Sequence, residues 1–176
     1  MKRLRAAAPL LLAALLAACA NPPRQPGEPA WTVGRLSLRI DATDTQPAQS
    51  VSAAFELRGD GGSGELRLNS PLGSRVASAR WAPGLALLAN GEGERRFRNL
   101  DELSREALGE NLPLAALPDW LAGKAWSGAP HEATEAGFEQ LGWQVSLARR
   151  SEGWIEARRP APPAVLVRVR LDEPPP

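Results

Sequence analysis

The sequence contains few of the residues on which enzymatic chemistry most often depends, since its 176 residues include one histidine, one cysteine and no tyrosine. The single histidine, His131, supplies neither a cluster of metal ligands nor a serine–histidine pair. The G-x-S-x-G nucleophile motif and the phosphate-binding P-loop motif do not occur in the chain. We therefore predict that the protein is not an enzyme, with no catalytic residue, no metal and no cofactor.

His131 itself lies in the polar run SGAPHEATEAG at 127–137, where Glu132 and Glu135 flank it. This setting predicts a solvent-exposed loop residue. Aromatic residues are also scarce: the six tryptophans and three phenylalanines are spread along the chain and do not alternate with basic residues. Nothing in this pattern predicts a nucleic-acid partner.

An apolar run long enough to form a membrane-spanning helix, about 20 residues, is missing from the N-terminus. The run AAAPLLLAALLAA at 6–18 is shorter than this and follows the basic residues Lys2, Arg3 and Arg5, which is typical of a secretory signal. It ends in LAAC at 16–19, the pattern of a bacterial lipobox, so we predict that Cys19 is lipidated after residues 1–18 are removed. The alternative is an ordinary cleaved signal with an accidental cysteine.

Cys19 has no partner for a disulfide within the chain, because it is the only cysteine. The residue after Cys19 is Ala20 and not an aspartate, and lipoproteins resembling this one are then usually sent to the outer membrane. Without residues 1–18 the chain has 18 basic and 20 acidic residues, a net charge of −2. We therefore expect no strong electrostatic attraction to anionic lipid.

Composition divides the whole chain into four parts. Residues 1–18 are the predicted signal, 19–30 a lipidated cysteine with a proline-rich tether, 31–171 a single domain, and 172–176 a disordered tail. Within the domain, apolar and polar residues alternate at 36–40, 51–57, 66–68, 75–81, 85–89, 94–98, 143–147 and 165–171, which predicts strands with one apolar face. Short turns between them favour a curled antiparallel sheet.

One helical block interrupts the strands. Asn99 is predicted to cap a helix over LDELSREAL with Glu102 as the reciprocal partner, and Gly109 to end it. The following segment LPLAALPDWLAG at 112–123 has helical spacing, and Pro118 is expected to split or kink it. We expect these helices to cover the concave face of the sheet. The run GDGGSG at 59–64 precedes a strand and is therefore predicted to be a hairpin turn, not a dinucleotide-binding loop.

The order of five segments resembles the LolB family of outer-membrane lipoproteins. These segments are LAAC at 16–19, WTVGRLSLRI at 31–40, ELRLNSPLGS at 65–74, LPLAALPDWLAG at 112–123 and GFEQLGWQV at 137–145. The chain departs from the pattern at Leu147, at Lys124-Ala125 and at the C-terminal LDEPPP, which puts the cavity shape and the last strand in question.

The resemblance implies a mainly β fold with short helices: an unclosed antiparallel β-barrel covered by an α-helical lid, with an apolar cavity for the acyl chains of a lipoprotein in transit. The covered strand faces and the lid then supply the candidate lining, although each position is equally compatible with a packed core: Leu36, Leu38, Phe55, Leu66, Leu68, Leu87, Trp120, Leu121, Trp143, Val145, Val167 and Val169.

Leu72 stands between Pro71 and Gly73 at the tip of a predicted turn. The residues alone favour a Leu72 side chain that folds back onto the turn. The resemblance instead implies an exposed leucine in a membrane insertion loop formed by Pro71, Leu72 and Gly73.

The implied partners are a periplasmic carrier resembling LolA, client lipoproteins and outer-membrane lipid, with the protein itself a monomer. The domain would be lipid-anchored and face the periplasm. Carrier docking by charged rim residues is implied too, without a choice among Arg35, Arg39, Arg67 and Arg75. Two other functions stay open. A structural or assembly-accessory lipoprotein would have a filled core and a larger exposed apolar patch, and a lipid-acting hydrolase would have a nucleophile near His131.

Overall fold

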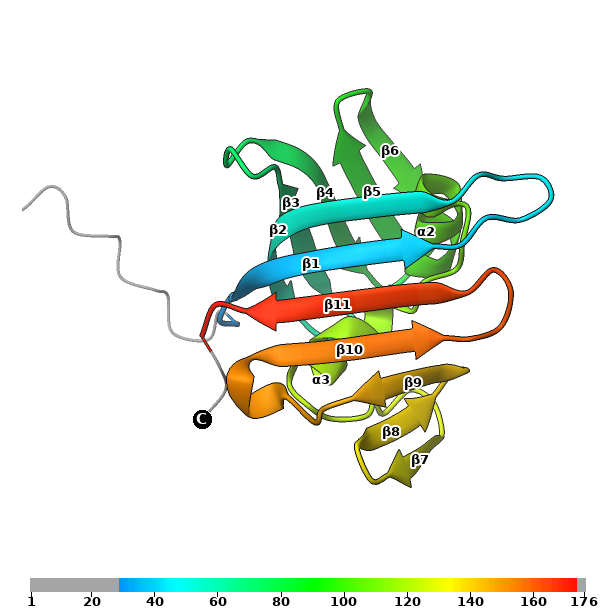
Figure 1. The fold of residues 1–176 in the computed structure, drawn as a ribbon. Coiled ribbons are helices and arrows are strands. Elements are labelled where there is room, and N and C mark those ends of the chain that lie inside the picture. The colour runs from blue at the N-terminus through cyan, green and yellow to red at the C-terminus, as the bar shows by residue number, and fades with distance from the viewer. Residues whose placement is uncertain (1–28, 174–176) are drawn as a thin grey trace, which may run out of the picture.

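The computed structural model describes residues 29–173 and consists mainly of one curled antiparallel sheet (Figure 1). In its first six strands, each strand pairs with the next one along the chain: β1 Thr32–Ile40, β2 Gln49–Gly59, β3 Gly64–Asn69, β4 Arg75–Ala82, β5 Leu85–Asn90 and β6 Gly93–Phe97. The last five do the same: β7 His131–Thr134, β8 Gly137–Gln140, β9 Trp143–Ser146, β10 Trp154–Arg159 and β11 Val165–Leu171. Pairing of β1 with β11 joins the two sets into eleven strands.

The sheet does not close, because β6 and β7 remain at its two edges. The predicted unclosed antiparallel sheet is therefore confirmed, and so is the last strand, which pairs with both β1 and β10. The sequence reading did not find β7, β8 and β10. Two of these are only four residues long, and β10 reads WIEARR, so charged residues weaken its alternation.

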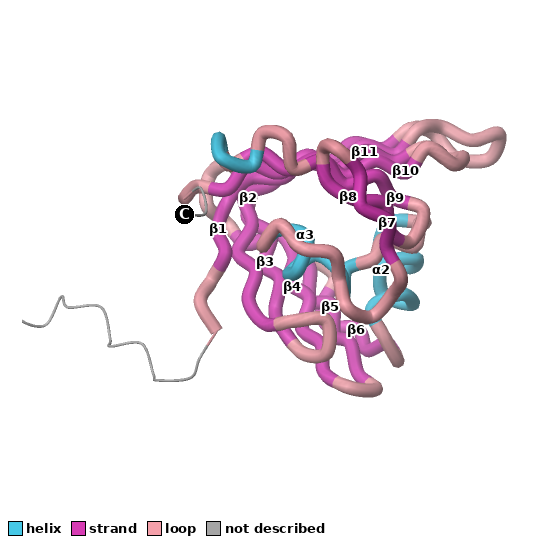
Figure 2. Tube along the Cα trace, turned by 90° about the horizontal axis from the view of Figure 1, so that it is seen from below, coloured by secondary structure: helices cyan, strands magenta, loops and turns pink. Residues whose placement is uncertain are grey.

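The chain must cross from one edge of the sheet to the other between β6 and β7, and this crossing forms the lid. It contains α2 Leu100–Leu108, the 3₁₀ turn η2 Leu114–Ala116 and α3 Leu117–Leu121, while a further 3₁₀ turn, η3 Arg150–Glu152, precedes β10. Figure 2 shows α3 inside the curve of the strands and α2 beside β5 and β6. The predicted helical cover of the concave face is confirmed.

The ends of α2 follow the sequence signals, with one difference. Asn99 Oδ1 accepts a hydrogen bond of 2.8 Å from Glu102 N, and Gly109 ends the helix with a φ of 72°. The Glu102 carboxylate reaches back to Arg98 N at 2.9 Å, one residue before the expected N-cap amide. Pro118 lies in the first turn of α3, where its missing N–H costs nothing, so the second block begins anew instead of kinking.

The hydrophobic core lies between the sheet and the lid. Its largest fully buried side chains include Trp120 from α3 and Phe55 from β2. The Phe55 ring lies over Gly34 of β1, where a side chain would overlap the Arg170 carbonyl group and crowd this ring. The predicted hairpin turn at 59–64 is confirmed, since Asp60 Oδ1 accepts hydrogen bonds from Gly62 N and Ser63 N.

Trp31, just before β1, packs on the outer face of the sheet. Two guanidinium groups contact its ring, with Cζ of Arg58 at 4.5 Å and Cζ of Arg67 at 4.2 Å from the ring centroid. The signal, 1–18, and Cys19 lie outside the described residues, as do most of the tether at 19–30 and part of the tail at 172–176.

Candidate functional site

An apolar cavity of about 110 Å³ lies between the concave face of the sheet and the lid. Its lining is supplied by inner faces of β1, β2, β3, β9, β10 and β11 and by the segment from the end of α2 to α3, without a charged side chain. The lining residues are Leu36, Leu38, Val51, Leu66, Leu68, Leu108, Leu112, Pro113, Leu114, Leu117, Trp120, Trp143, Ala157 and Val167.

Seven of the candidate lining residues lie in this cavity: Leu36, Leu38, Leu66, Leu68, Trp120, Trp143 and Val167. Three others, Phe55, Val145 and Val169, are buried in the packed core beside it. Leu121 lines a different pocket. These four side chains lie beside the cavity because one face of a strand or helix serves both packing and lining, and only neighbouring side chains decide which.

Leu87 lies apart from the cavity for another reason. In β5 the buried side chains are Ala86 and Leu88, whereas Leu87 pairs with Arg80 and Arg96 on the outer face of the sheet. The segment LALLAN has apolar residues at both odd and even positions, so alternation alone does not say which set faces inward.

The sequence reading missed other lining residues. Val51, Leu114 and Leu117 lie inside the predicted strand at 51–57 and the predicted helical segment at 112–123, so their apolar faces already contain them. Ala157 belongs to β10, which was not recognised, and nothing in its sequence signals a cavity.

One buried side chain, Gln140 of β8, holds the α3 part of the lid. Its Oε1 accepts hydrogen bonds of 2.9 Å from Trp120 Nε1 and from Trp126 N, and its Nε2 donates to the carbonyl oxygens of Trp126 and Ala129. All four hydrogen bonds that an amide side chain can make are therefore present. Because Gln140 is buried, this set fixes Trp120 as a wall of the cavity.

The β3–β4 loop extends away from the sheet (Figure 1), and it contains Leu72. Gly73 N donates to Ser70 O at 2.9 Å, which closes a turn with Pro71 and Leu72 at its two central positions and a φ of 83° at Gly73. Leu72 is 95% exposed. The expectation of an exposed leucine is confirmed, and the alternative of a side chain folded back onto the turn is wrong.

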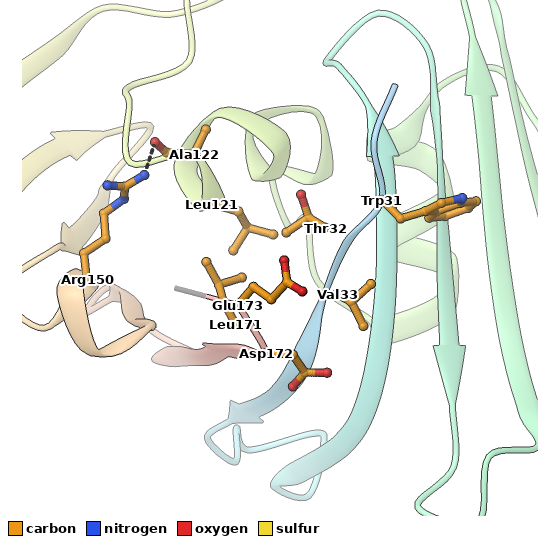
Figure 3. Close-up of a pocket in the computed structure, with 9 residues that line it drawn as sticks. All are labelled: Trp31, Thr32, Val33, Leu121, Ala122, Arg150, Leu171, Asp172 and Glu173. Atoms are coloured by element: carbon orange, nitrogen blue, oxygen red, sulfur yellow. Dashed lines mark hydrogen bonds between the residues drawn. The ribbon is translucent and has the colours of Figure 1, made fainter. Parts of the chain in front are cut away.

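A second, larger pocket of about 680 Å³ opens at the start of β1 and the end of β11 (Figure 3). Leu121, Arg150 and Asp172 are among its mixed lining, and Arg150 Nη2 donates to the Ala122 carbonyl group at 2.8 Å. By strand register this pocket lies at the end of β1–β4 away from Leu72. Its charged lining does not match an apolar ligand.

Charged groups on the outer face form a compact ladder over β2 and β3. Glu65 accepts hydrogen bonds from Arg67 Nε at 2.7 Å and from Arg58 Nη2 at 3.0 Å, and Arg67 also reaches Glu56 at 3.3 Å. Burial alone raises the pKa of Glu65, but hydrogen bonds from Arg67 and Arg58 outweigh it, so its pKa lies below the ordinary value of 4.5. Of the four arginines considered for carrier docking, Arg67 is therefore engaged here, and Arg39 pairs with Asp41.

His131 lies in β7, not in a loop, but its side chain is exposed as expected. It contacts the Phe138 ring edge-to-face at 6.3 Å. Within residues 29–173 no group of three or more His, Cys, Asp or Glu residues could hold a metal ion. Nor does this part of the chain include a helix long and apolar enough to cross a membrane.

These features define a mainly β protein, an unclosed antiparallel barrel with an apolar cavity beneath a short helical lid. Residues 31–170 match the family described as "Outer membrane lipoprotein LolB", and the chain belongs to this family. The prediction that the protein is not an enzyme is confirmed by this membership, since the family consists of lipoproteins of the localisation pathway.

Relatives with the same name agree along most of the chain. The Outer-membrane lipoprotein LolB of Bordetella pertussis is 36% identical over 79% of this chain and 75% of its own length. That of Bordetella petrii is 33% identical over 93% of this chain and 89% of its own length, and that of Chromobacterium violaceum is 32% identical over 81% and 82%.

Proposed function

We propose that this protein is an outer-membrane lipoprotein receptor. It accepts lipoproteins from a periplasmic carrier resembling LolA, holds their acyl chains in the apolar cavity and inserts them into the outer membrane. The observation that carries the proposal is the cavity beneath the lid, whose lining is apolar throughout. Family membership supports the localisation and the lipoprotein clients.

The physical basis is burial of hydrocarbon. Each methylene group removed from water stabilises the bound state by about 0.8 kcal/mol, so an apolar cavity retains acyl chains without any reaction. A carrier and a receptor with similar cavities differ only modestly in affinity. Transfer between them then proceeds down a small free-energy difference and needs no nucleotide.

The cavity must enlarge to work in this way. Pockets that enclose a drug-sized ligand measure about 300–1,000 Å³, whereas this cavity measures about 110 Å³. Accommodating an acyl chain therefore requires the lid to move away from the sheet. Since Gln140 holds α3 through buried hydrogen bonds, we expect α2 to move.

Leu72 would provide the contact with the bilayer, with Pro71 and Gly73 shaping the turn that presents it. One leucine immersed in lipid contributes only about 1.5–3 kcal/mol, which is enough to orient the domain but too little to anchor it. The anchor would be the acylated Cys19, with two or more acyl chains giving stable attachment and the domain facing the periplasm. We further propose that the protein works as a monomer.

The second candidate is a structural or assembly-accessory lipoprotein that binds a protein partner without lipid. The open space beneath the lid argues against it, because that function needs a filled core. Its apolar patch would be larger than one leucine, and Val51 and Val76 are exposed besides Leu72. A transfer experiment separates the two.

In this experiment the protein without its lipidated Cys19 is mixed with carrier loaded with a lipoprotein, and the two are separated by affinity tag. We expect the lipoprotein to move to this protein, and to pass into liposomes when these are added. The matched control replaces cavity-lining Leu66 with Glu. A lipoprotein that stays on the carrier, or that moves equally to the Leu66→Glu variant, would overturn the proposed function.

A further inference from the structure

A groove of about 490 Å³ runs between α2 and strands β3–β5. Its floor includes Ala79 and Leu88, and its helical wall includes Leu103 and Leu108. The volume falls within the range of about 300–1,000 Å³ that encloses a drug-sized ligand. Unlike the cavity, the groove therefore has a volume sufficient for part of an extended hydrocarbon chain as it stands.

The groove continues into the cavity. Four apolar residues line both spaces: Leu66 and Leu68 of β3, Leu108 at the end of α2, and Leu114 of η2. A chain that lies along these side chains passes from one space to the other without meeting a charged group. The two spaces together form one continuous path beneath the lid, apolar where they join, whose groove part also carries the charged residues Glu92, Arg95 and Glu106.

The far end of the groove opens at Val76, close to the membrane insertion loop in the sheet register. Leu68 pairs with Ala77 and Asn69 pairs with Arg75, so Val76 bulges between them without a partner. Val76 lines the groove and is 48% exposed. Asn69 and Arg75 are the residues that flank the loop of Leu72, so the exposed valine lies directly beside the base of this loop.

The outer rim of the groove is polar and weakly held. Arg95 of β6 donates to Glu106 of α2 at 3.0 Å, with 42% and 57% of their side chains exposed. Exposed ion pairs of this kind contribute little to stability. The rim therefore gives way more readily than α3, which the buried Gln140 holds through Trp120.

We infer that this groove is the path by which the acyl chain of a client lipoprotein passes between the cavity and the membrane surface at Leu72, with Val76 at its mouth. The inference rests on the proposed function and adds the route. It assigns α2 as the side of the lid that yields and Val76 as the last groove residue that a departing chain touches before it reaches the membrane at Leu72.

The test uses photo-crosslinking in the full lipidated protein. A photoreactive amino acid replaces Val76, Val51 or Val33 in turn, and client lipoproteins carry alkyne-labelled acyl chains. Val51 lines the cavity but not the groove, whereas Val33 is exposed at the other end of β1–β4. We expect client adducts at positions 76 and 51 and none at 33.

The following outcomes would contradict the route, and one of them would contradict the proposed function as well. Adducts at 51 without adducts at 76 would overturn the route and leave the proposed function intact, whereas client adducts at neither position would overturn both. A position-76 adduct of phospholipid size alone makes Val76 a membrane contact and also overturns the route. Equal client adducts at 33 and 76 would mean unspecific contact and would contradict the route as well.

A blocking variant gives an independent measurement. Val76→Trp should slow delivery into liposomes about tenfold, the factor expected when a bulky side chain in the path costs the passing chain about 1.4 kcal/mol. Val33→Trp, the matched control, should deliver at the normal rate. Thermal unfolding of both variants checks that they are folded. A folded Val76→Trp variant with normal delivery would contradict the route.

Discussion

The carboxylate of Glu110 accepts a hydrogen bond of 2.7 Å from Arg159 Nη2, with only 18% and 16% of the two side chains exposed. Glu110 follows α2, whereas Arg159 ends β10 in the other half of the sheet and also donates to Pro163 O at 3.0 Å. This ion pair therefore ties the connection after α2 to the far side of the curled sheet.

Glu110→Ala should lower the free energy of unfolding by about 1–3 kcal/mol, because it leaves a largely buried guanidinium without its acidic partner. Urea denaturation followed by tryptophan fluorescence measures this loss. Glu94→Ala is the matched control, since its ion pair with Arg80 is about half exposed and should change stability much less. Equal losses of stability in the two variants would contradict the larger contribution that we assign to the buried Glu110–Arg159 ion pair.

Leu72→Glu should leave folding and acceptance of lipoproteins unchanged and slow delivery into liposomes about ten- to hundredfold, the rate equivalent of about 1.5–3 kcal/mol of lost lipid contact. The exposed side chain makes no core contact whose loss would destabilise the fold. Delivery is measured as lipoprotein recovered with floated liposomes. Leu72→Met keeps the apolar contact and should deliver normally. Normal delivery by Leu72→Glu would contradict the insertion role.

Gln140→Leu should lower the free energy of unfolding by at least about 3 kcal/mol, because it removes four hydrogen bonds from buried groups at nearly constant volume. It should also shift the fluorescence of Trp120, whose Nε1–H loses its partner. The control is Gln144→Leu, which removes one exposed hydrogen bond to Glu139. If both variants unfold at the same urea concentration, Gln140 does not hold the lid.

Leu141→Asn should stabilise the protein by about 1 kcal/mol, because Leu141 has a φ of 56°, a left-handed conformation that costs most L-residues about 1–2 kcal/mol. With Gly142 at a φ of 76°, this β8–β9 turn has the conformation for which Asn-Gly is preferred. The melting temperature measures the gain. Gly142→Ala should do the opposite, and a lower melting temperature for Leu141→Asn would contradict the explanation.

Stability should fall in acid partly because of Glu65. Its pKa is lower in the folded state than the ordinary value of 4.5, so in acid the folded state binds fewer protons than the unfolded state. This contribution is fully present above pH 4.5 and is lost as the pH falls through the lower folded pKa. The free energy of unfolding of Glu65→Gln, measured by urea denaturation across this range, should therefore decline less steeply in acid than that of the unchanged protein. Parallel declines would contradict the assignment.

Local chemistry determined a large part of the fold. The alternation in β1–β4, the Asn99 and Gly109 ends of α2 and the Asp60 hairpin depend on neighbours within a few residues, and the sequence was sufficient to predict them. The short strands β7 and β8 and the charged β10 depend on pairing with distant segments, and sequence reading did not find them.

The site divides in the same way. The sequence placed Leu72 at the tip of a turn and identified most of the apolar strand faces, because both follow from turn chemistry and from a period of two. Tertiary structure alone decided that Leu87 faces outward, that Phe55 packs while Leu68 lines the cavity, and that a groove under α2 reaches Val76. The physical reason is that burial is a property of contacts between distant segments, and the pattern along one segment does not say which neighbour covers it.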